Sequence, residues 1–293
     1  MKKNTSMKRA IILQILLVIT GFAIAKTPAY VELEAGGGVV LMPYGNIDNG
    51  IVSGGNFDVA VKYTLLFKTR PNIRQSFGIN FGAGLSTFQG TKVLDGEYEF
   101  PSIDDQGRDY LLNTNIQNWT ERQQSYAFNI PINLFYQLKP NRMHSGWFIS
   151  LGVKLYVPFS ATFKVTQGDI TTKGWYEQYG GTWIENLPLH GFGMRNDFLP
   201  TGKIQTNLFV SGQIQAGVLF RLDKKREMYV AGYIEHGFNN MFVKSSDNPL
   251  FISPTQYNGF YSSNLSTSSL PIITGIKIGW RFADVHECNC INR

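Results

Sequence analysis

The fold class is decided by the stretch Trp147-Phe148-Ile149-Ser150-Leu151-Gly152-Val153-Lys154-Leu155-Tyr156-Val157-Pro158-Phe159. Every odd-numbered position holds a large apolar side chain, while the even-numbered positions include Ser150, Gly152 and Lys154. Successive side chains of a β-strand point to opposite faces, so the stretch predicts a strand with one apolar face and one mixed or polar face. A helix is not indicated, because the apolar residues form no stripe with a 3.6-residue period.

The same alternation returns in seven other segments. They are residues 31–41, 57–67, 77–85, 126–136, 208–222, 228–238 and 272–282. The chain thus predicts about eight strands of roughly 10 to 17 residues, longer than the 5 to 6 residues usual in soluble proteins.

The connections between these strands alternate between short and long. The short ones are residues 68–74, 139–145 and 223–226, and the long ones are approximately residues 42–54, 89–121, 164–203 and 244–269. Outer-membrane barrels show this alternation, with short periplasmic turns and long extracellular loops. We therefore predict an all-β protein: an eight-stranded antiparallel transmembrane β-barrel with both termini in the periplasm.

A soluble eight-stranded barrel of the lipocalin type is the alternative, with its apolar face inside. Against it, the polar faces are poor in Lys and Glu, and the apolar faces end in aromatic residues. One predicted aromatic rim, on the periplasmic side, comprises Phe67, Phe77, Tyr136, Trp147, Trp280 and Phe282. The other comprises Phe57, Tyr126, Phe128, Phe159 and Phe238. Two aromatic belts around an aliphatic band are typical of membrane proteins, which favours the membrane barrel.

Composition agrees with an exported membrane protein. Only 16% of the 293 residues are charged, against about 25% in ordinary soluble domains. Residues 1–25 combine a basic start, an apolar stretch and the ending Ala23-Ile24-Ala25, the pattern of a signal peptide. Without them the net charge falls from +6 to about +2 (23 basic and 21 acidic residues), so the basic pI indicates no nucleic-acid partner. We expect residues 26–282 to form the barrel and 283–293 a periplasmic tail.

The predicted strands place charged residues on the face that would line the lumen. The acids are Glu32, Glu34, Asp58 and Glu235, and the bases are Lys62, Lys154, Arg221, Lys277 and Arg281. An eight-stranded barrel is barely wide enough for its own side chains. We therefore expect these groups to pair into a polar plug, and a narrow ion path is the alternative.

The end of the last strand, Gly275-Ile276-Lys277-Ile278-Gly279-Trp280-Arg281-Phe282, resembles the β-signal read by the outer-membrane assembly machinery, with Ile278, Trp280 and Phe282 as its apolar positions. The chain as a whole resembles the small outer-membrane β-barrel superfamily, of the OmpA/OmpX-like type, and its porin-family relatives in Bacteroidetes. The resemblance implies the Gram-negative outer membrane, its lipid and lipopolysaccharide, and the assembly machinery as surroundings. Phe282 is followed by residues 283–293, too few for a peptidoglycan-binding domain.

Chemical motifs are few. His236 invites comparison with lipid A deacylases, eight-stranded barrels with a His/Ser pair on a late strand, but Phe238 stands where the serine is expected. His286, Cys288 and Cys290 could form a strained disulfide, an intermolecular bridge or a soft-metal site, or be an incidental tail. We expect no enzyme activity, no catalytic residue, no metal and no cofactor.

The third long connection holds the ligand-binding candidates Trp175, Tyr176, Tyr179 and Trp183, among several glycines. Exposed aromatic rings suit a glycan or protein ligand, and the alternative is that they pack on one another and cap the barrel. The acidic segment 95–109 is a candidate for contact with divalent cations that bridge lipopolysaccharide. We expect a monomeric protein with structural, adhesive or ligand-binding roles. A small porin-like channel and an outer-leaflet lipid-modifying enzyme are the alternatives.

Overall fold

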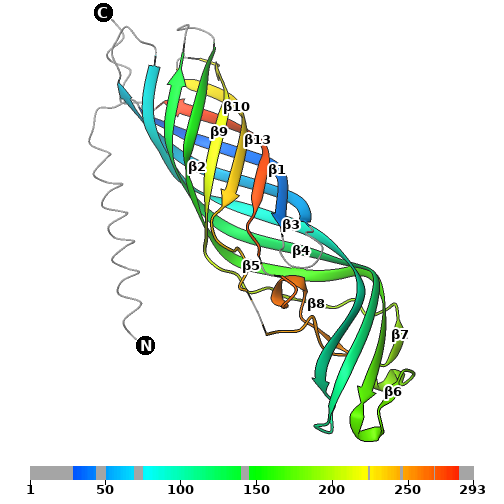
Figure 1. The fold of residues 1–293 in the computed structure, drawn as a ribbon. Coiled ribbons are helices and arrows are strands. Elements are labelled where there is room, and N and C mark those ends of the chain that lie inside the picture. The colour runs from blue at the N-terminus through cyan, green and yellow to red at the C-terminus, as the bar shows by residue number, and fades with distance from the viewer. Residues whose placement is uncertain are drawn as a thin grey trace, which may run out of the picture.

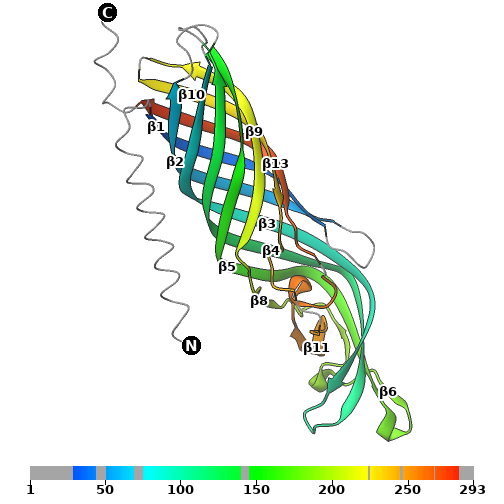
Figure 2. The same cartoon turned by 60° about the vertical axis from the view of Figure 1, so that its left-hand side comes forward.

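The computed structural model describes residues 29–43, 51–68, 75–139, 145–223, 225–244, 247–266 and 268–283. Its long strands are β1 (Ala29–Pro43), β2 (Ile51–Lys68), β3 (Gln75–Ile103), β4 (Asp109–Leu138), β5 (Ser145–Tyr176), β9 (Phe209–Arg221), β10 (Arg226–Gly237) and β13 (Ile272–Ala283). Each pairs antiparallel with its neighbours in the order β4-β3-β2-β1-β13-β10-β9-β5, and β5 pairs with β4, so the sheet closes on itself (Figures 1 and 2). The predicted eight-stranded antiparallel barrel is confirmed.

The two faces of the barrel strands differ as the alternation predicts. On β5, Leu151 is 56% exposed on the outside, whereas Ser150 and Lys154 are 5% and 2% exposed and point inward. Leu134 on β4 and Ile214 on β9, the partners of Leu151 in the register, are also exposed. An aliphatic band that faces outward from a closed barrel with a polar interior is the arrangement that hydrocarbon requires, so the fold is that of a transmembrane β-barrel.

Aromatic side chains bound this band at both ends. Near the start of β3, the end of β4 and the start of β5, the ring of Tyr136 lies 4.8 Å from that of Phe77 and 5.7 Å from that of Trp147. At the other end, the ring of Phe159 lies 4.9 Å from that of Phe128 and 6.2 Å from that of Tyr126. The two ends are called the short-turn rim and the crown rim below. Their positions match the two predicted belts.

Beyond the crown rim, the predicted loops are largely strands. We expected residues 89–121 and 164–203 to be long loops, but β3 continues to Ile103, β4 starts at Asp109, and β5 runs on to Tyr176 (Figure 1). The alternation persists there with its sides exchanged: the inward positions become apolar, as at Phe88, Leu112 and Ile116, because water replaces lipid outside. A pattern of apolar residues on the outer face therefore ends at the rim although the strands do not.

The extended strands carry a compact structure that we name the crown, comprising the described residues within 88–123, 161–208 and 239–271. Short strands β6 (Thr182–Ile184), β7 (Gly193–Arg195) and β8 (Thr201–Lys203) pair with β5. A separate hairpin is formed by β11 (Phe251–Ser253) and β12 (Gln256–Tyr257). The 3-10 helices are η1 (Glu177–Tyr179), η2 (Pro188–His190) and η3 (Phe260–Ser262). No helix among the described residues is long and apolar enough to cross a membrane.

Some predicted features lie outside the described residues. These are the signal peptide (residues 1–25) and the His286, Cys288 and Cys290 cluster of the tail. The last described strand, β13, ends at Ala283, one residue beyond the predicted end of the barrel.

The aliphatic band yields a direct stability test. Replacing Leu151→Arg puts a guanidinium into the band between two other outward aliphatic positions, and we expect a loss of about 2–4 kcal/mol in the free energy of unfolding. The measurement is urea unfolding of the refolded protein in lipid vesicles. Thr166→Arg is the control, because Thr166 is exposed on the same strand above the crown rim, and it should change stability by less than about 0.5 kcal/mol. Equal losses in both variants would contradict the position of the band.

Candidate functional site

The middle of the lumen is filled by charged side chains, each at most 3% exposed: Glu32, Glu34, Asp58, Lys62, Lys154, Glu235, Lys277 and Arg281. Four are acidic and four are basic, so their formal charges cancel. Lys62 Nζ lies 2.5 Å from Glu34 Oε1. Five strands contribute to the set, and the buried charges therefore tie together positions that are far apart in the sequence.

Lys277 lies at the centre of this network. Its Nζ is 3.3 Å from Glu34 Oε1, 3.6 Å from Glu235 Oε1 and 3.8 Å from Asp58 Oδ2. Lys154 Nζ bridges two of the same acids, at 2.9 Å from Asp58 Oδ2 and 3.3 Å from Glu235 Oε1. These two ammoniums therefore each neutralise more than one carboxylate, so neither depends on a single contact.

Nearer the short-turn rim, Arg281 forms a second centre. Its Nε lies 2.7 Å from Glu32 Oε1, and its guanidinium carbon is 4.4 Å from the ring centroid of Phe135 and 5.3 Å from that of Phe148. Thr64 Oγ1 also donates a hydrogen bond to Glu32 Oε1 at 2.6 Å. The arginine is thus held by a carboxylate on one side and by aromatic faces on the other.

Arg221 is a correction to the predicted set. It is exposed at the end of β9, and its Nε donates to the backbone oxygen of Asp223 at 3.0 Å. Its strand position has the parity of an inward residue, but the strand ends there and the side chain reaches the short turn. Without Arg221 the buried acids and bases are equal in number.

Apolar layers close the network above and below. On the crown side, the ring of Tyr156 stacks on that of Phe209 at 4.4 Å and meets Phe88 at 5.4 Å. On the short-turn side lies a buried cluster of Leu66, Phe135, Phe148, Leu219, Tyr229 and Ala231. The two layers are bonded to the network, because Tyr156 Oη donates to Glu235 at 2.5 Å and Tyr229 Oη to Glu34 at 2.6 Å. Side chains therefore occupy the lumen along the barrel.

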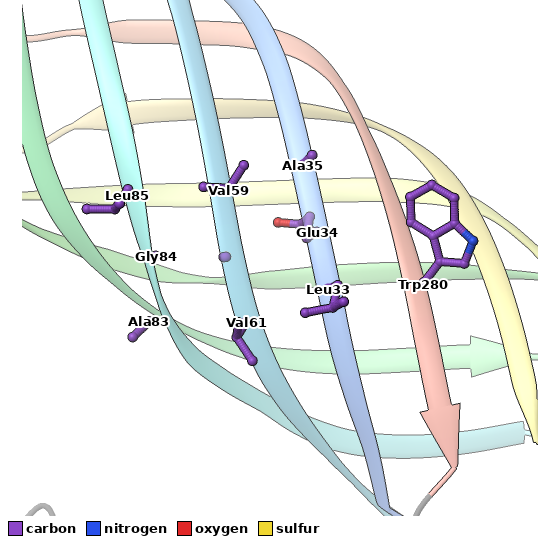
Figure 3. A pocket seen from close by; sticks show the side chains of 10 residues that line it. Leu33, Glu34, Ala35, Val59, Val61, Ala83, Gly84, Leu85 and Trp280 are labelled. Carbon is purple, nitrogen blue, oxygen red and sulfur yellow. The ribbon is translucent and has the colours of Figure 1, made fainter.

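A shallow groove of about 460 Å³ lies on the outside, between β1, β2 and β3 (Figure 3). It is lined by apolar side chains such as Leu33, Val61 and Leu85, it is deepened by small residues such as Ala83, and the indole of Trp280 stands on its β13 side. The apolar residues that line the groove belong to the aliphatic band, so the groove faces lipid and not water.

The crown has its own core, in which Trp119 is fully buried against Phe251 and Tyr257, with ring centroids 6.0 and 5.4 Å away. These two partners lie in the β11–β12 hairpin, so the last long connection folds down onto β4. Gly168, at φ 139°, faces Trp119: an added Cβ would lie 2.6 Å from the Trp119 Cα. A glycine is needed there for both reasons.

Glu121 is a buried acid within this core, and it was not among the residues that the sequence analysis predicted for a site. Its carboxylate accepts hydrogen bonds from Tyr257 Oη at 2.5 Å, from the Phe260 backbone N–H at 2.9 Å and from Gln123 Nε2 at 2.7 Å. Burial raises the pKa of the Glu121 carboxyl, and the three donors oppose that shift. The structure explains why parity missed this residue: Asn118 has φ 52° at a break in the β4–β5 register, after which odd-numbered positions of β4 point inward.

The predicted ligand-binding aromatics separate into two pairs. Tyr176 is buried and stacks on Tyr110 at 4.9 Å, and its ring also lies 5.6 Å from that of Tyr179. Trp175 and Trp183 lie 5.3 Å apart, and Lys173 Nζ is 4.7 Å from the Trp183 ring. Tyr176 therefore packs in the core, whereas Tyr179 and Trp183 remain exposed.

The far end of the crown, beside β6 and β7, exposes large apolar side chains. Leu189 is 98% exposed and Met194 is 72% exposed. Leu187 and Trp183 are partly exposed in the same region. We name Trp183, Leu187, Leu189 and Met194 the tip patch. All four belong to the segment that runs from β6 to β7, and both of these strands pair with β5. Exposed apolar and aromatic side chains on one segment are characteristic of binding surfaces.

The described residues do not bring the other candidate metal or catalytic residues together into a site. Within the described residues, no group of three or more His, Cys, Asp and Glu side chains forms a metal site. His236 is exposed at the outer end of β10 beside Phe238, with ring centroids 6.3 Å apart. The apolar β-signal positions Ile278, Trp280 and Phe282 all face outward on β13.

No protein-family model and no curated protein matches this chain. Among solved structures, the chain is similar to the crystal structure of Neisserial surface protein A (NspA), with 9% identity and a TM-score of 0.37 over 87% of this chain and 96% of that chain. It is also similar to Ail, the attachment invasion locus protein of Yersinia pestis, alone and in complex with the heparin analogue sucrose octasulfate. Those comparisons give 10% identity and TM-scores of 0.26 and 0.27, over 87% of this chain and 99% of that chain. Likenesses at this level assign no function.

The lumen network predicts strong coupling between Glu32 and Arg281. Glu32→Gln leaves the guanidinium buried without a carboxylate, and we expect a loss of about 3–5 kcal/mol in the free energy of unfolding. Combining Glu32→Gln with Arg281→Met removes both charges, so the double variant should be more stable than the single one. Urea unfolding in vesicles of wild type, Glu32→Gln, Arg281→Met and the double variant completes the cycle. Additive losses would contradict the coupling.

Glu121 predicts that the crown loosens as the pH rises. An exposed glutamate has a pKa of about 4.3, and in the crown this pKa is raised. The folded crown therefore binds the proton more tightly than an unfolded one, so the resulting stability is fully present below about pH 4.3 and is lost as the pH rises through the raised pKa. Hydrogen exchange of residues 251–263, corrected for the intrinsic rate, should quicken over that range. The Glu121→Gln variant should lack this dependence, and an unchanged profile in it would refute the assignment.

Proposed function

We propose that this protein is an integral outer-membrane β-barrel with a closed lumen, whose crown displays the tip patch to a partner protein outside the cell. It would be a member of the small outer-membrane barrel superfamily, act without catalysis, and keep the short-turn rim and both termini in the periplasm. The observation that carries this proposal is the contrast between the neutralised, side-chain-filled lumen and the strands that continue far beyond the membrane band. A chain that serves only as a pore has no use for such strands.

The composition of the tip patch favours a protein partner over a glycan. Leu189 and Met194 are more exposed than Trp183 or Tyr179, and aliphatic and Met side chains gain most from burial against another protein surface. Within the same segment, Phe192 packs on Tyr110, which stacks on Tyr176, so the segment is anchored to the ends of β4 and β5. Anchoring of this kind lowers the entropy that binding must overcome.

The structure also bears on the two alternative functions, a channel and a lipid-modifying enzyme. A channel requires a continuous water path, which the buried charges and the two apolar layers oppose. A lipid-modifying enzyme requires a nucleophile beside His236, and its neighbour on the same face is Phe238.

The proposal predicts that adhesion depends on the tip patch. The chain is produced on the surface of a non-adherent Gram-negative host, and attachment to cultured cells is counted. The double variant Leu189→Ser/Met194→Ser should reduce attachment about tenfold or more, since removing a hot-spot pair costs about 2 kcal/mol or more. Val93→Ser, at a 50% exposed crown position on β3, is the control and should attach like wild type. A planar-bilayer recording of the same wild-type protein should show no sustained conductance.

Equal attachment by wild type and the tip variant, at equal surface levels, would contradict the display role. Attachment abolished by glycosidase treatment of the cells, with no dependence on Leu189 or Met194, would favour a glycan ligand. Sustained conductance would contradict the closed lumen.

A further inference from the structure

Three cations gather on the outer surface of the crown, directly above the crown rim. They are Arg122 on β4, Lys164 on β5 and Lys203 on β8, and all three side chains are exposed. The name cation triad is used for these residues. They are separated by up to 81 positions in sequence, so their proximity is a product of the strand register.

The register brings the triad together. Arg122 lies directly opposite Lys164 across the β4–β5 pair. Lys203 lies opposite Thr162, which is two positions before Lys164 on the same face of β5. Direct partners in antiparallel strands have Cβ atoms about 4.5–5.5 Å apart, and diagonal neighbours are about 7–8 Å apart, within reach of long side chains.

Like charges at such positions destabilise a sheet unless something neutralises them. Among the described residues, no carboxylate lies within 4.0 Å of these three cations to form a salt bridge. The contact that Arg122 does make is to a neutral group, from Nη2 to Gln89 Oε1 at 3.3 Å. The lumen cations, by contrast, each have a carboxylate partner. The triad therefore presents positive charge to its surroundings.

The surroundings are set by the distance to the membrane band. On β4, Tyr126 marks the crown rim, Gln124 follows it, and Arg122 comes next on the same face; Gln124 Nε2 hydrogen-bonds Tyr126 Oη at 2.6 Å. At about 3.3 Å per residue, the triad is about 7 to 13 Å beyond the rim along the strands. A headgroup layer is about 5 to 8 Å thick on each side of the hydrocarbon, and flexible Lys and Arg side chains reach back into it.

We infer that the cation triad binds the phosphate groups of a phosphorylated lipid of the outer leaflet, whose acyl chains lie on the aliphatic band beneath Tyr126 and Phe159. This inference rests on the proposed outer-membrane placement. The guanidinium of Arg122 offers a fork of donors for phosphate oxygens, and the two ammoniums add point charges. The band below offers Phe128, Phe159 and Val157 to the chains of the same molecule. Charge and apolar surface together match an amphipathic anion and not a free one.

The test measures lipid binding by native mass spectrometry of the full chain released from detergent micelles. The probe is lipid A carrying two phosphates, and the variant is Arg122→Gln/Lys164→Gln. The control variant, Lys225→Gln/Arg226→Gln, removes the same formal charge at exposed positions of the opposite, short-turn end. Boiled and unboiled samples on a gel verify that each variant is a folded barrel.

The double variant should bind bisphosphorylated lipid A about 30-fold more weakly than wild type, since each cation near a charged membrane surface contributes about 1 kcal/mol. The control variant should stay within about twofold of wild type. Lipid A stripped of phosphate should bind wild type and the double variant equally. Raising the salt concentration should weaken wild-type binding more than that of the double variant.

Three outcomes would overturn the inference. They are unchanged binding by the double variant, an equal loss in the control variant, and wild-type affinity for inorganic phosphate equal to that for lipid A. The last would mark a site for free anions. None of them bears on the display role, since adhesion through Leu189 and Met194 is measured separately from lipid binding.

Discussion

The structure depends on one constraint: hydrocarbon surrounds the barrel, so each strand must turn its apolar face outward and bury its polar face. Eight charges thereby share a space that an eight-stranded barrel barely provides. They are tolerable only because they cancel, and Lys277 illustrates how, with three carboxylate oxygens between 3.3 and 3.8 Å from its Nζ. Closure of the barrel and pairing of the charges support each other, since Glu34, Lys154 and Lys277 come from three different strands and meet only in the closed ring. The same pairing leaves no excess charge in the lumen to attract ions.

Above the crown rim the constraint is reversed on the same strands. Water now lies outside, so the apolar residues of β3, β4 and β5 turn inward and form a core with the β11–β12 hairpin. Glu121 is the exception, a carboxylate in an apolar core, and its three donors come from β4 itself and from the hairpin region. The side chain fixes where the last long connection sits on the sheet. The membrane boundary thus lies where the apolar residues of these strands change from the outward face to the inward face.

The local alternation was enough to predict the barrel strands and their parity, because a period of two assigns every side chain of a strand to a face. The prediction that Arg221 lines the lumen was wrong, because alternation assigns a side chain to a face only while the strand continues, and β9 ends at that residue. The crown parts of β3, β4 and β5 were predicted as loops for another reason: the band of apolar residues on the outer face, which indicates the strands, stops at the rim. Glu121 meets Tyr257 across 136 positions, and Arg122 meets Lys164 only through a register shifted by irregularities near Thr120 and Tyr126. Contacts of that kind depend on how strands are offset, which residue patterns in one sequence do not specify.

The edge of the crown sheet shows why binding there should use side chains and not strand addition. β2 pairs with β3 only as far as Thr91, so within the described residues the part of β3 beyond it has a strand partner on one side alone. Such an edge invites another chain, yet this one is interrupted by a register shift at Gly96 (φ 140°), by exposed Glu97 and Glu99, and by Pro101, which lacks a backbone donor. These are the devices that discourage strand pairing between molecules. With its edge blocked, the crown leaves its side-chain surfaces for binding, and the two proposed ones are the apolar tip at its far end and the basic triad at its base.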